Sequence, residues 1–373
     1  EPSEENRAVA KSSIGDLEDL ERTELLSNQR MATYFSEISA TPEQVEISSW
    51  DDWITVAPNL GFIEARRFAE SAKTKWPIEK QLITSADVDH MVSLLDGTSN
   101  EKLLTLYQGL PFMVGWVKSD EHWPNLNYVP VYRQLLLLLL LGEGSREGNL
   151  EAITDLFVAL ITLNADDGDY KSVLGDLAGQ LQTRVSNRDI DWLVDMVEIT
   201  LALPVNDVGT RDEFIGAAAN RLNDLSIWMN DHQTMLVRSL LDTVGLRDLI
   251  QEPNHGNVDS PKRNSIQAVQ NLTIGIYTLT ESVGRRAVQV VEKLFPGVSV
   301  TFNSDHTSTS RLQSLAQNSD LFVICWNSAK HAATYAIQDE RRPEGLETRY
   351  ATGTSSIVRE VTIFVADTQS AAA

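Results

Sequence analysis

Cysteine is almost absent from this chain of 373 residues, which contains only Cys325. A single cysteine cannot form a disulfide within the chain or supply a cysteine-based zinc site. This composition is typical of a reducing compartment, so we expect a cytoplasmic protein and predict no cofactor. Cys325 lies in an apolar run, which favours a small buried side chain over a nucleophile.

Long hydrophobic runs are also lacking. The most apolar stretch, 135–141, is seven leucines long, whereas a helix needs about 20 apolar residues to cross a membrane. We interpret this stretch as a fully buried helix of a bundle and expect no membrane association. No signal-peptide pattern follows Glu1, and we expect the chain to be a piece of a longer protein.

Basic residues are scarce in most of the chain. It has 31 Lys and Arg against 53 Asp and Glu, and only nine of the basic and ten of the acidic residues lie from Ile266 onward. The preceding region therefore carries nearly all of the net charge of −22. Such a region repels a phosphate backbone, so we expect it not to bind duplex nucleic acid directly. Its charge favours either a basic partner protein or simply a well-solvated surface.

Strand-like alternation is missing between residues 14 and 250, where apolar residues recur at helical spacing. We expect an all-helical domain over 14–250, arranged as a solenoid or an irregular bundle. Residues 1–13 are polar and small, which predicts a disordered tail. Residues 251–265 contain Pro, Gly, Asn and Ser and few apolar residues, which predicts a linker and a domain boundary.

Strand and helix patterns alternate over 266–366. Strands that are apolar on both faces and separated by single helices belong to a parallel sheet covered by helices. We therefore predict a small parallel α/β domain of the flavodoxin-like or Rossmann-like kind. The expected strands are 272–278, 298–302, 321–326 and 346–351, and the expected helices are 282–295, 310–317 and 329–339.

The end of the chain has a less regular pattern. We expect a helical turn over 354–360 and an edge strand over 361–365 (VTIFV). Residues 367–373 are small and polar, which predicts a second disordered tail.

Small polar residues fill the loops that follow the predicted strands. In an open parallel sheet, ligands bind beyond the carboxyl ends of the strands, where backbone N–H groups at helix starts bind anions such as phosphate. Ordinary helix capping explains the single serines and threonines at least as well. The candidate ligand-binding residues are Thr280, Ser282, Asp305, His306, Lys330, His331, Ser355, Ser356 and Arg359.

Lys330 is the candidate that capping does not explain, because a helix dipole disfavours a cation at the start of a helix. A negative group must compensate it, and either Asp305 or a bound anion fits. His306 and His331 follow consecutive strands, and with Asp305 they form a possible acid–base or metal site at a spacing that matches no metal motif. We predict no metal there.

Four segments of this region resemble the C-terminal domain of DpdD-type proteins, which occur in bacterial DNA-modification and phage-defence islands. The resemblance implies a role beside DNA-modifying or DNA-restricting enzymes and implies no particular reaction. It suggests that Asp305, His306, Lys330, His331, Thr334, Ser355, Ser356 and Arg359 line a shared pocket. The segments are 277–282 (YTLTES), 303–312 (NSDHTSTSRL), 328–337 (SAKHAATYAI) and 353–360 (GTSSIVRE).

On this basis we expect a non-enzymatic accessory or sensor subunit. Its α/β domain would bind a phosphorylated ligand, such as a nucleotide or a nucleic-acid end, and its helical region would bind other proteins of the same system. Two alternatives stay open. One is a hydrolase or nuclease-like enzyme that uses His306 and His331, with Lys330 and Arg359 stabilising developing negative charge; the other is a scaffold without a ligand.

Overall fold

The computed structural model describes residues 47–60, 62–97, 100–142, 147–163, 167–250, 272–325, 329–342 and 345–372. The predicted tail over 1–13 and the predicted linker over 251–265 lie outside these ranges. The chain divides into two compact units, Glu1–Asp176 (unit 1) and Leu177–Ala373 (unit 2).

Unit 1 is helical throughout its described part, and tryptophans form the centre of its core. The Trp50 ring centroid lies 5.3–5.7 Å from those of Trp53, Trp76 and Trp116. Edge-to-face contacts of this kind add stabilisation to the burial of the rings. The α-helices are α4 (Trp50–Val56), α5 (Phe62–Lys75), α6 (Ser85–Asp96), α7 (Asn100–Leu106), α8 (Leu110–Val117), α9 (Val129–Leu141), α10 (Glu147–Leu163) and the start of α11 (Asp167–Arg184).

The leucine run belongs to α9, which packs against α6, α8 and α10. Its residues are mostly buried, but Leu137 and Leu141 are 39% and 54% exposed. The expectation of full burial is wrong for these two, because residues four apart share one helix face and none of the described residues covers this face. None of the helices that the structure describes has the length and apolarity needed to cross a membrane.

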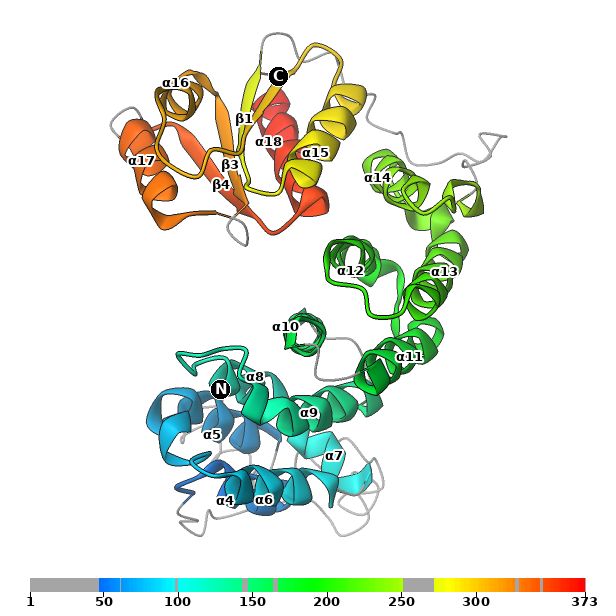
Figure 1. The fold of residues 1–373 in the computed structure, drawn as a ribbon, viewed down its shortest axis with the longest axis vertical. Coiled ribbons are helices and arrows are strands. Elements are labelled where there is room, and N and C mark those ends of the chain that lie inside the picture. The colour runs from blue at the N-terminus through cyan, green and yellow to red at the C-terminus, as the bar shows by residue number, and fades with distance from the viewer. Residues whose placement is uncertain are drawn as a thin grey trace, which may run out of the picture. The chain divides into compact units, whose positions relative to one another are not determined.

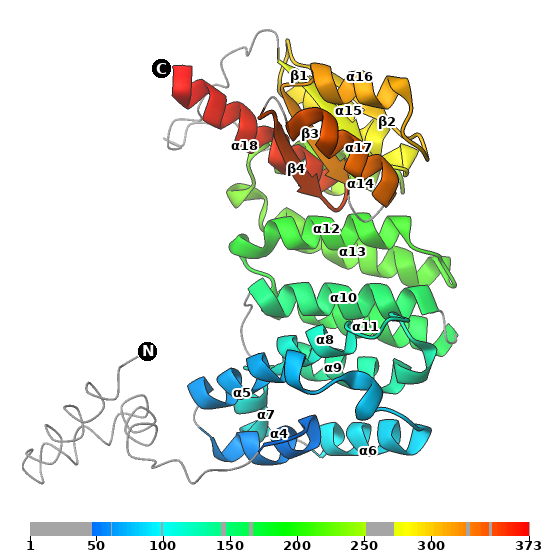
Figure 2. The same cartoon turned by 90° about the vertical axis from the view of Figure 1, so that its left-hand side faces the viewer.

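Unit 2 starts with helices and ends with a parallel α/β sheet. Its first helices are α12 (Ile190–Ala202), α13 (Val208–Asp224) and α14 (Asp231–Asp242), and α12 and α13 lie side by side (Figure 2). The sheet has the order β2-β1-β3-β4. Its strands are β1 (Thr273–Tyr277), β2 (Ser299–Asn303), β3 (Leu321–Cys325) and β4 (Glu347–Ala351), all paired in parallel.

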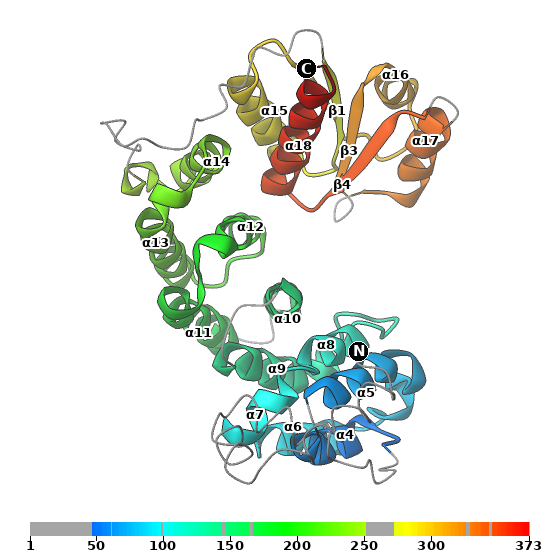
Figure 3. The same cartoon turned by 180° about the vertical axis from the view of Figure 1, so that it is seen from behind.

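Helices cover both faces of the sheet. One face carries α15 (Glu281–Leu294) and α18 (Thr354–Ala372), and the other carries α16 (Ser310–Asn318) and α17 (His331–Arg341) (Figures 1 and 3). The chain runs outward from β1 to β2 and from β3 to β4, so the strand order reverses between β1 and β3. The predicted fold class, helices followed by a small parallel α/β domain, is confirmed.

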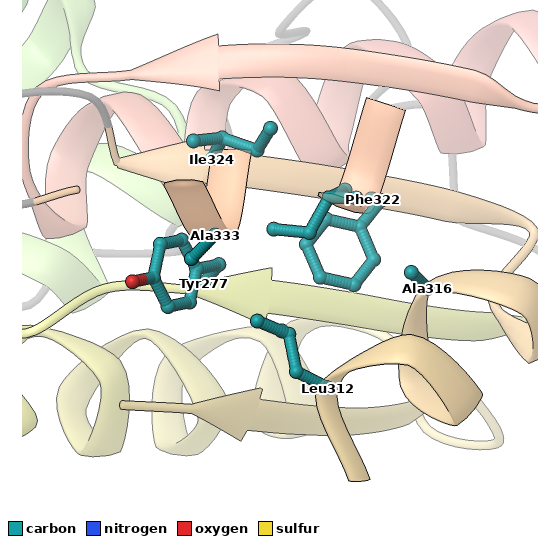
Figure 4. Packing of buried hydrophobic residues seen from close by; sticks show 7 residues of the cluster. Tyr277, Leu312, Ala316, Phe322, Ile324 and Ala333 are labelled. Atoms are coloured by element: carbon teal, nitrogen blue, oxygen red, sulfur yellow. The ribbon is translucent and has the colours of Figure 1, made fainter. Parts of the chain in front are cut away.

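A tightly packed layer joins the sheet to α16 and α17 (Figure 4). Tyr277 and Phe322 contact Leu312 and Ala333 there, and all four are fully buried. Gly275 makes this layer possible, because a Cβ atom at that position would lie 2.5 Å from the Phe322 ring. A larger residue would push the ring away and open a gap in the core.

The predicted edge strand over 361–365 is wrong, since α18 is one helix that continues to Ala372. Its buried residues include Ile357, Val361 and Val365, which recur every four positions and therefore lie on one helix face. Ile363, in the middle of the same short run, lies on another face of the helix and is 44% exposed. The predicted tail over 367–373 is likewise helical through Ala372.

The domain boundary also differs from the prediction, because the second compact unit begins at Leu177 and not at 266. α12 packs against α18, and α14 packs against both α15 and α18. The polar segment at 251–265 marks a change of sequence pattern, but the helices before it belong to the same packed unit as the sheet.

Arg341 connects the amino-terminal ends of β3 and β4 to the end of α16. It is 1% exposed and donates hydrogen bonds to four backbone oxygens, those of Ala316, Ser319, Asp320 and Glu347, the first residue of β4. A buried carbonyl that loses its donor costs stability. The guanidinium therefore holds α16, β3 and β4 together.

Replacing this arginine is predicted to destabilise unit 2. Arg341→Met leaves several buried carbonyls without donors, and we expect a loss of about 3–5 kcal/mol. Hydrogen exchange of the β3 and β4 amides measures the loss locally. The neighbouring exposed Arg342→Met is the control and should change little; equal exchange rates in the two variants would contradict this role of Arg341.

Candidate functional site

The first turn of α18 binds a carboxylate that comes from α12. The Thr354 backbone N–H donates to Glu198 Oε1 at 2.6 Å, and the Ser355 N–H donates to Glu198 Oε2 at 2.9 Å. The Ser355 hydroxyl adds a third hydrogen bond to Oε2, at 3.0 Å. Unpaired N–H groups and the helix dipole make a helix start a favourable place for an anion. Glu198 fills that place from within the chain.

The surroundings of Glu198 fit a buried negative charge. The residue is 5% exposed, and Arg286 Nη1 of α15 lies 3.8 Å from its Oε1. A Cβ atom at Gly353 would lie 2.9 Å from Oε2, so a residue without a side chain is needed there. A buried carboxylate is tolerated only when hydrogen bonds and an opposite charge compensate it. Backbone, hydroxyl and guanidinium together provide this compensation.

A second carboxylate, Asp195, lies beside the first. It shares the single proton of the Ser355 hydroxyl with Glu198, and its Oδ2 lies 3.9 Å from Arg359 Nη1. Burial raises the pKa of Asp195 to about 6, with Glu198 adding to the increase. We call the group formed by Asp195, Glu198, Arg286, Ser355 and Arg359 the carboxylate clamp.

Ser356 stabilises the loop that leads into the clamp. Its hydroxyl accepts hydrogen bonds from the N–H groups of Thr352 and Gly353, at 2.7 and 2.9 Å, and donates to the Gly353 carbonyl. Three residues predicted to bind a ligand, Ser355, Ser356 and Arg359, therefore have partners inside the chain.

The other predicted residues lie around the ends of β1, β2 and β3. The Tyr277 hydroxyl at the end of β1 donates to the backbone oxygen of Asp305, at 3.0 Å. The Asp305 carboxylate accepts hydrogen bonds from Thr309 Oγ1 and Asn303 Nδ2, which hold its pKa below the usual value. This carboxylate therefore stays ionised and fixes the loop between β2 and α16.

Lys330 occupies the N-cap position of α17 in an extended conformation, and its side chain is exposed. No ion pair joins it to Asp305 in the described part of the chain. His331 and Ser282 lie in the first turns of α17 and α15, and His306 is exposed on the loop between β2 and α16. Thr280 precedes α15 without a capping hydrogen bond from its side chain.

The chain matches a known protein family over nearly its whole length. The family described as DpdD-like matches residues 2–360, which include the clamp and the loops at the strand ends. The chain belongs to the DpdD-like family. Membership suggests a role in a DNA-modification system. The curated proteins and the solved structures contain no match to the chain.

In this DpdD-like protein, the residues that sequence reasoning missed are the partners on α12 and α15. Asp191, Asp195 and Glu198 recur at helical spacing in an otherwise apolar helix, and this pattern is the signal that was available. Acids on the apolar face of a helix need a buried partner. Among the side chains that the structure describes, no three His, Cys, Asp or Glu residues are grouped to hold a metal.

The raised pKa of Asp195 predicts a pH dependence of stability. Its folded-state pKa of about 6 exceeds the ordinary 3.8, so the folded state binds the proton more tightly. Stability from this group is therefore present below pH 4 and is lost as the pH rises toward 6, by about 1–3 kcal/mol.

Asp195→Asn removes this titration and keeps an oxygen that accepts from Ser355. Calorimetric melting of the DpdD-like protein between pH 4 and pH 8 should give a flatter profile for the variant and equal or higher stability at pH 8. Asp224→Asn, at an exposed position of α13, is the matched control and should retain the wild-type profile. A wild-type slope in Asp195→Asn would contradict this assignment.

Proposed function

We propose that this DpdD-like protein is a non-enzymatic accessory or sensor subunit of a bacterial DNA-modification or phage-defence system. Its α/β domain binds a phosphorylated ligand, a nucleotide or a nucleic-acid end, at the carboxyl ends of β1 and β3. Its acidic helices bind other proteins of the system. The family match supports the setting, and the loops at the strand ends support the ligand site.

The charge of Lys330 is the observation that carries the ligand proposal, because the residues that the structure describes form no ion pair with it. A cation at a helix start is unfavourable by about 0.3–1 kcal/mol unless a negative group lies nearby. Asp305 was one possible compensation, but no ion pair joins it to Lys330 in the described ranges, and its oxygens accept hydrogen bonds from Asn303 and Thr309. The other possible compensation is an anionic ligand that binds beside Lys330.

The helix starts at this edge of the sheet support the same position. α16 is capped by the Thr309 hydroxyl, and α18 is capped by Glu198. α15 and α17 have no capping hydrogen bond from a side chain at Thr280 or Lys330. These two helices follow β1 and β3, between which the strand order reverses. Open parallel sheets bind ligands at such a point.

The acidic surface of the helices supports the proposed protein partners. Residues before Ile266 carry nearly all of the net charge of −22. This charge repels nucleic acid and attracts basic protein surfaces, and it accelerates association at low salt. The nucleic-acid end in this proposal therefore contacts the α/β domain only.

A thermal-shift series with simple phosphates, nucleotides and oligonucleotides tests the ligand site. A ligand at a hundredfold excess over its Kd stabilises the protein by about 2.7 kcal/mol. Lys330→Ala should leave the free protein as stable as the wild type, or slightly more stable, and should abolish the shift. Lys293→Ala removes an exposed lysine from the other end of α15 and should keep the shift.

The outcomes separate the alternatives. No shift of the wild type with any phosphorylated compound would contradict ligand binding and favour the scaffold. A shift that survives in Lys330→Ala would place the site elsewhere in the chain.

A further inference from the structure

Unit 1 contains a cavity that the proposed function does not use. It lies between α5, α8 and α10 and has a volume of about 660 Å³. Sites for small molecules usually measure 300–1,000 Å³ and combine apolar walls with a few polar groups. Phe112 and Tyr107 provide rings on its lining, and Arg66 and Asn149 provide hydrogen-bond donors.

Asn149 is the most informative residue of this lining. It is 3% exposed, and its buried Nδ2 atom has no hydrogen-bond partner among the residues that the structure describes. An unsatisfied buried amide costs about 1–3 kcal/mol, so such groups call for an explanation. Asn149 lies in the first turn of α10, a helix of 17 residues that begins at Glu147, where N–H groups and the helix dipole favour an anion. A ligand atom that accepts a hydrogen bond would satisfy this amide once the Asn149 side chain turns so that the buried Nδ2 reaches the cavity.

Arg66 contributes a positive charge on the same lining. Its guanidinium carbon lies 5.8 Å from the centroid of the Phe112 ring, and no ion pair joins it to a carboxylate in the described ranges. By contrast, Lys118 Nζ lies 2.5 Å from Asp155 Oδ2, so its charge is already matched. Arginine binds planar oxyanions through two parallel hydrogen bonds.

We propose that this cavity binds a small organic oxyanion, a carboxylate or a phosphate ester, that also carries a flat ring. Arg66 and Asn149 bind the oxyanion, and the ring packs against Phe112 and Tyr107. This site is separate from the loops at the ends of β1 and β3, because all of its residues belong to unit 1.

Calorimetric titration of the full chain with four simple probes tests the proposal. Phenyl phosphate and benzoate carry both a ring and an oxyanion, inorganic phosphate lacks the ring, and benzamide lacks the charge. We expect the first two to bind, and we expect inorganic phosphate and benzamide to bind at least about tenfold more weakly. No binding of phenyl phosphate or benzoate at millimolar concentration, or equal binding of benzamide, would overturn it.

Variants assign the binding to this cavity. Arg66→Gln and Asn149→Leu should each weaken binding about tenfold or more. Asn149→Leu should not lower the melting temperature, because it removes the buried Nδ2 donor that has no partner among the described residues. Arg67→Gln is the matched control, since Arg67 is exposed, lies 3.9 Å from Glu64 and does not line the cavity. Unchanged binding in Arg66→Gln overturns the proposal even if Asn149→Leu does not fold. Binding lost in Lys330→Ala instead would assign it to unit 2 and equally overturn it.

Discussion

The carboxylate of Glu198 at the start of α18 is the interaction on which the arrangement of unit 2 depends. Removing this charge from water is costly, and the first turn of α18 and Arg286 are the groups that compensate it. Because hydrogen bonds to two consecutive N–H groups are directional, α12 has little freedom relative to α18. The helices before the sheet and the sheet itself therefore form one packed unit.

This interaction also decides where the sheet can bind a ligand. A phosphate at the α18 start would have to displace a buried carboxylate that has three hydrogen bonds. Among the described residues at the ends of β1 and β3, neither Thr280 nor Lys330 caps its helix through a side chain. The hydroxyl-rich loop before α18 and the hydroxyl-rich loops before α15 and α17 therefore have different roles. The first joins helices within unit 2, and the others form the site that we propose for a ligand.

Much of the fold was predictable because its signals are local. The four strands lie within a residue or so of the predicted ranges, since apolar runs between turns identify buried strands. The end of α18 was not predictable from its short apolar run, because residues four apart, such as Val361 and Val365, share one face in a helix and also in a strand. The carboxylate clamp was not predictable from the sequence for another reason. Glu198 and Thr354 are 156 residues apart, and helix capping within the loop explains the serines equally well.

The most direct test of the clamp is hydrogen exchange of the Thr354 and Ser355 amides in the wild type and in Glu198→Ala. If Glu198 accepts from these amides, both should be protected in the wild type and should exchange much faster in the variant, together with a loosening of α12 against α18. Glu213→Ala, which removes an exposed acid from α13, should leave them protected. Equal protection in wild type and Glu198→Ala would contradict the account.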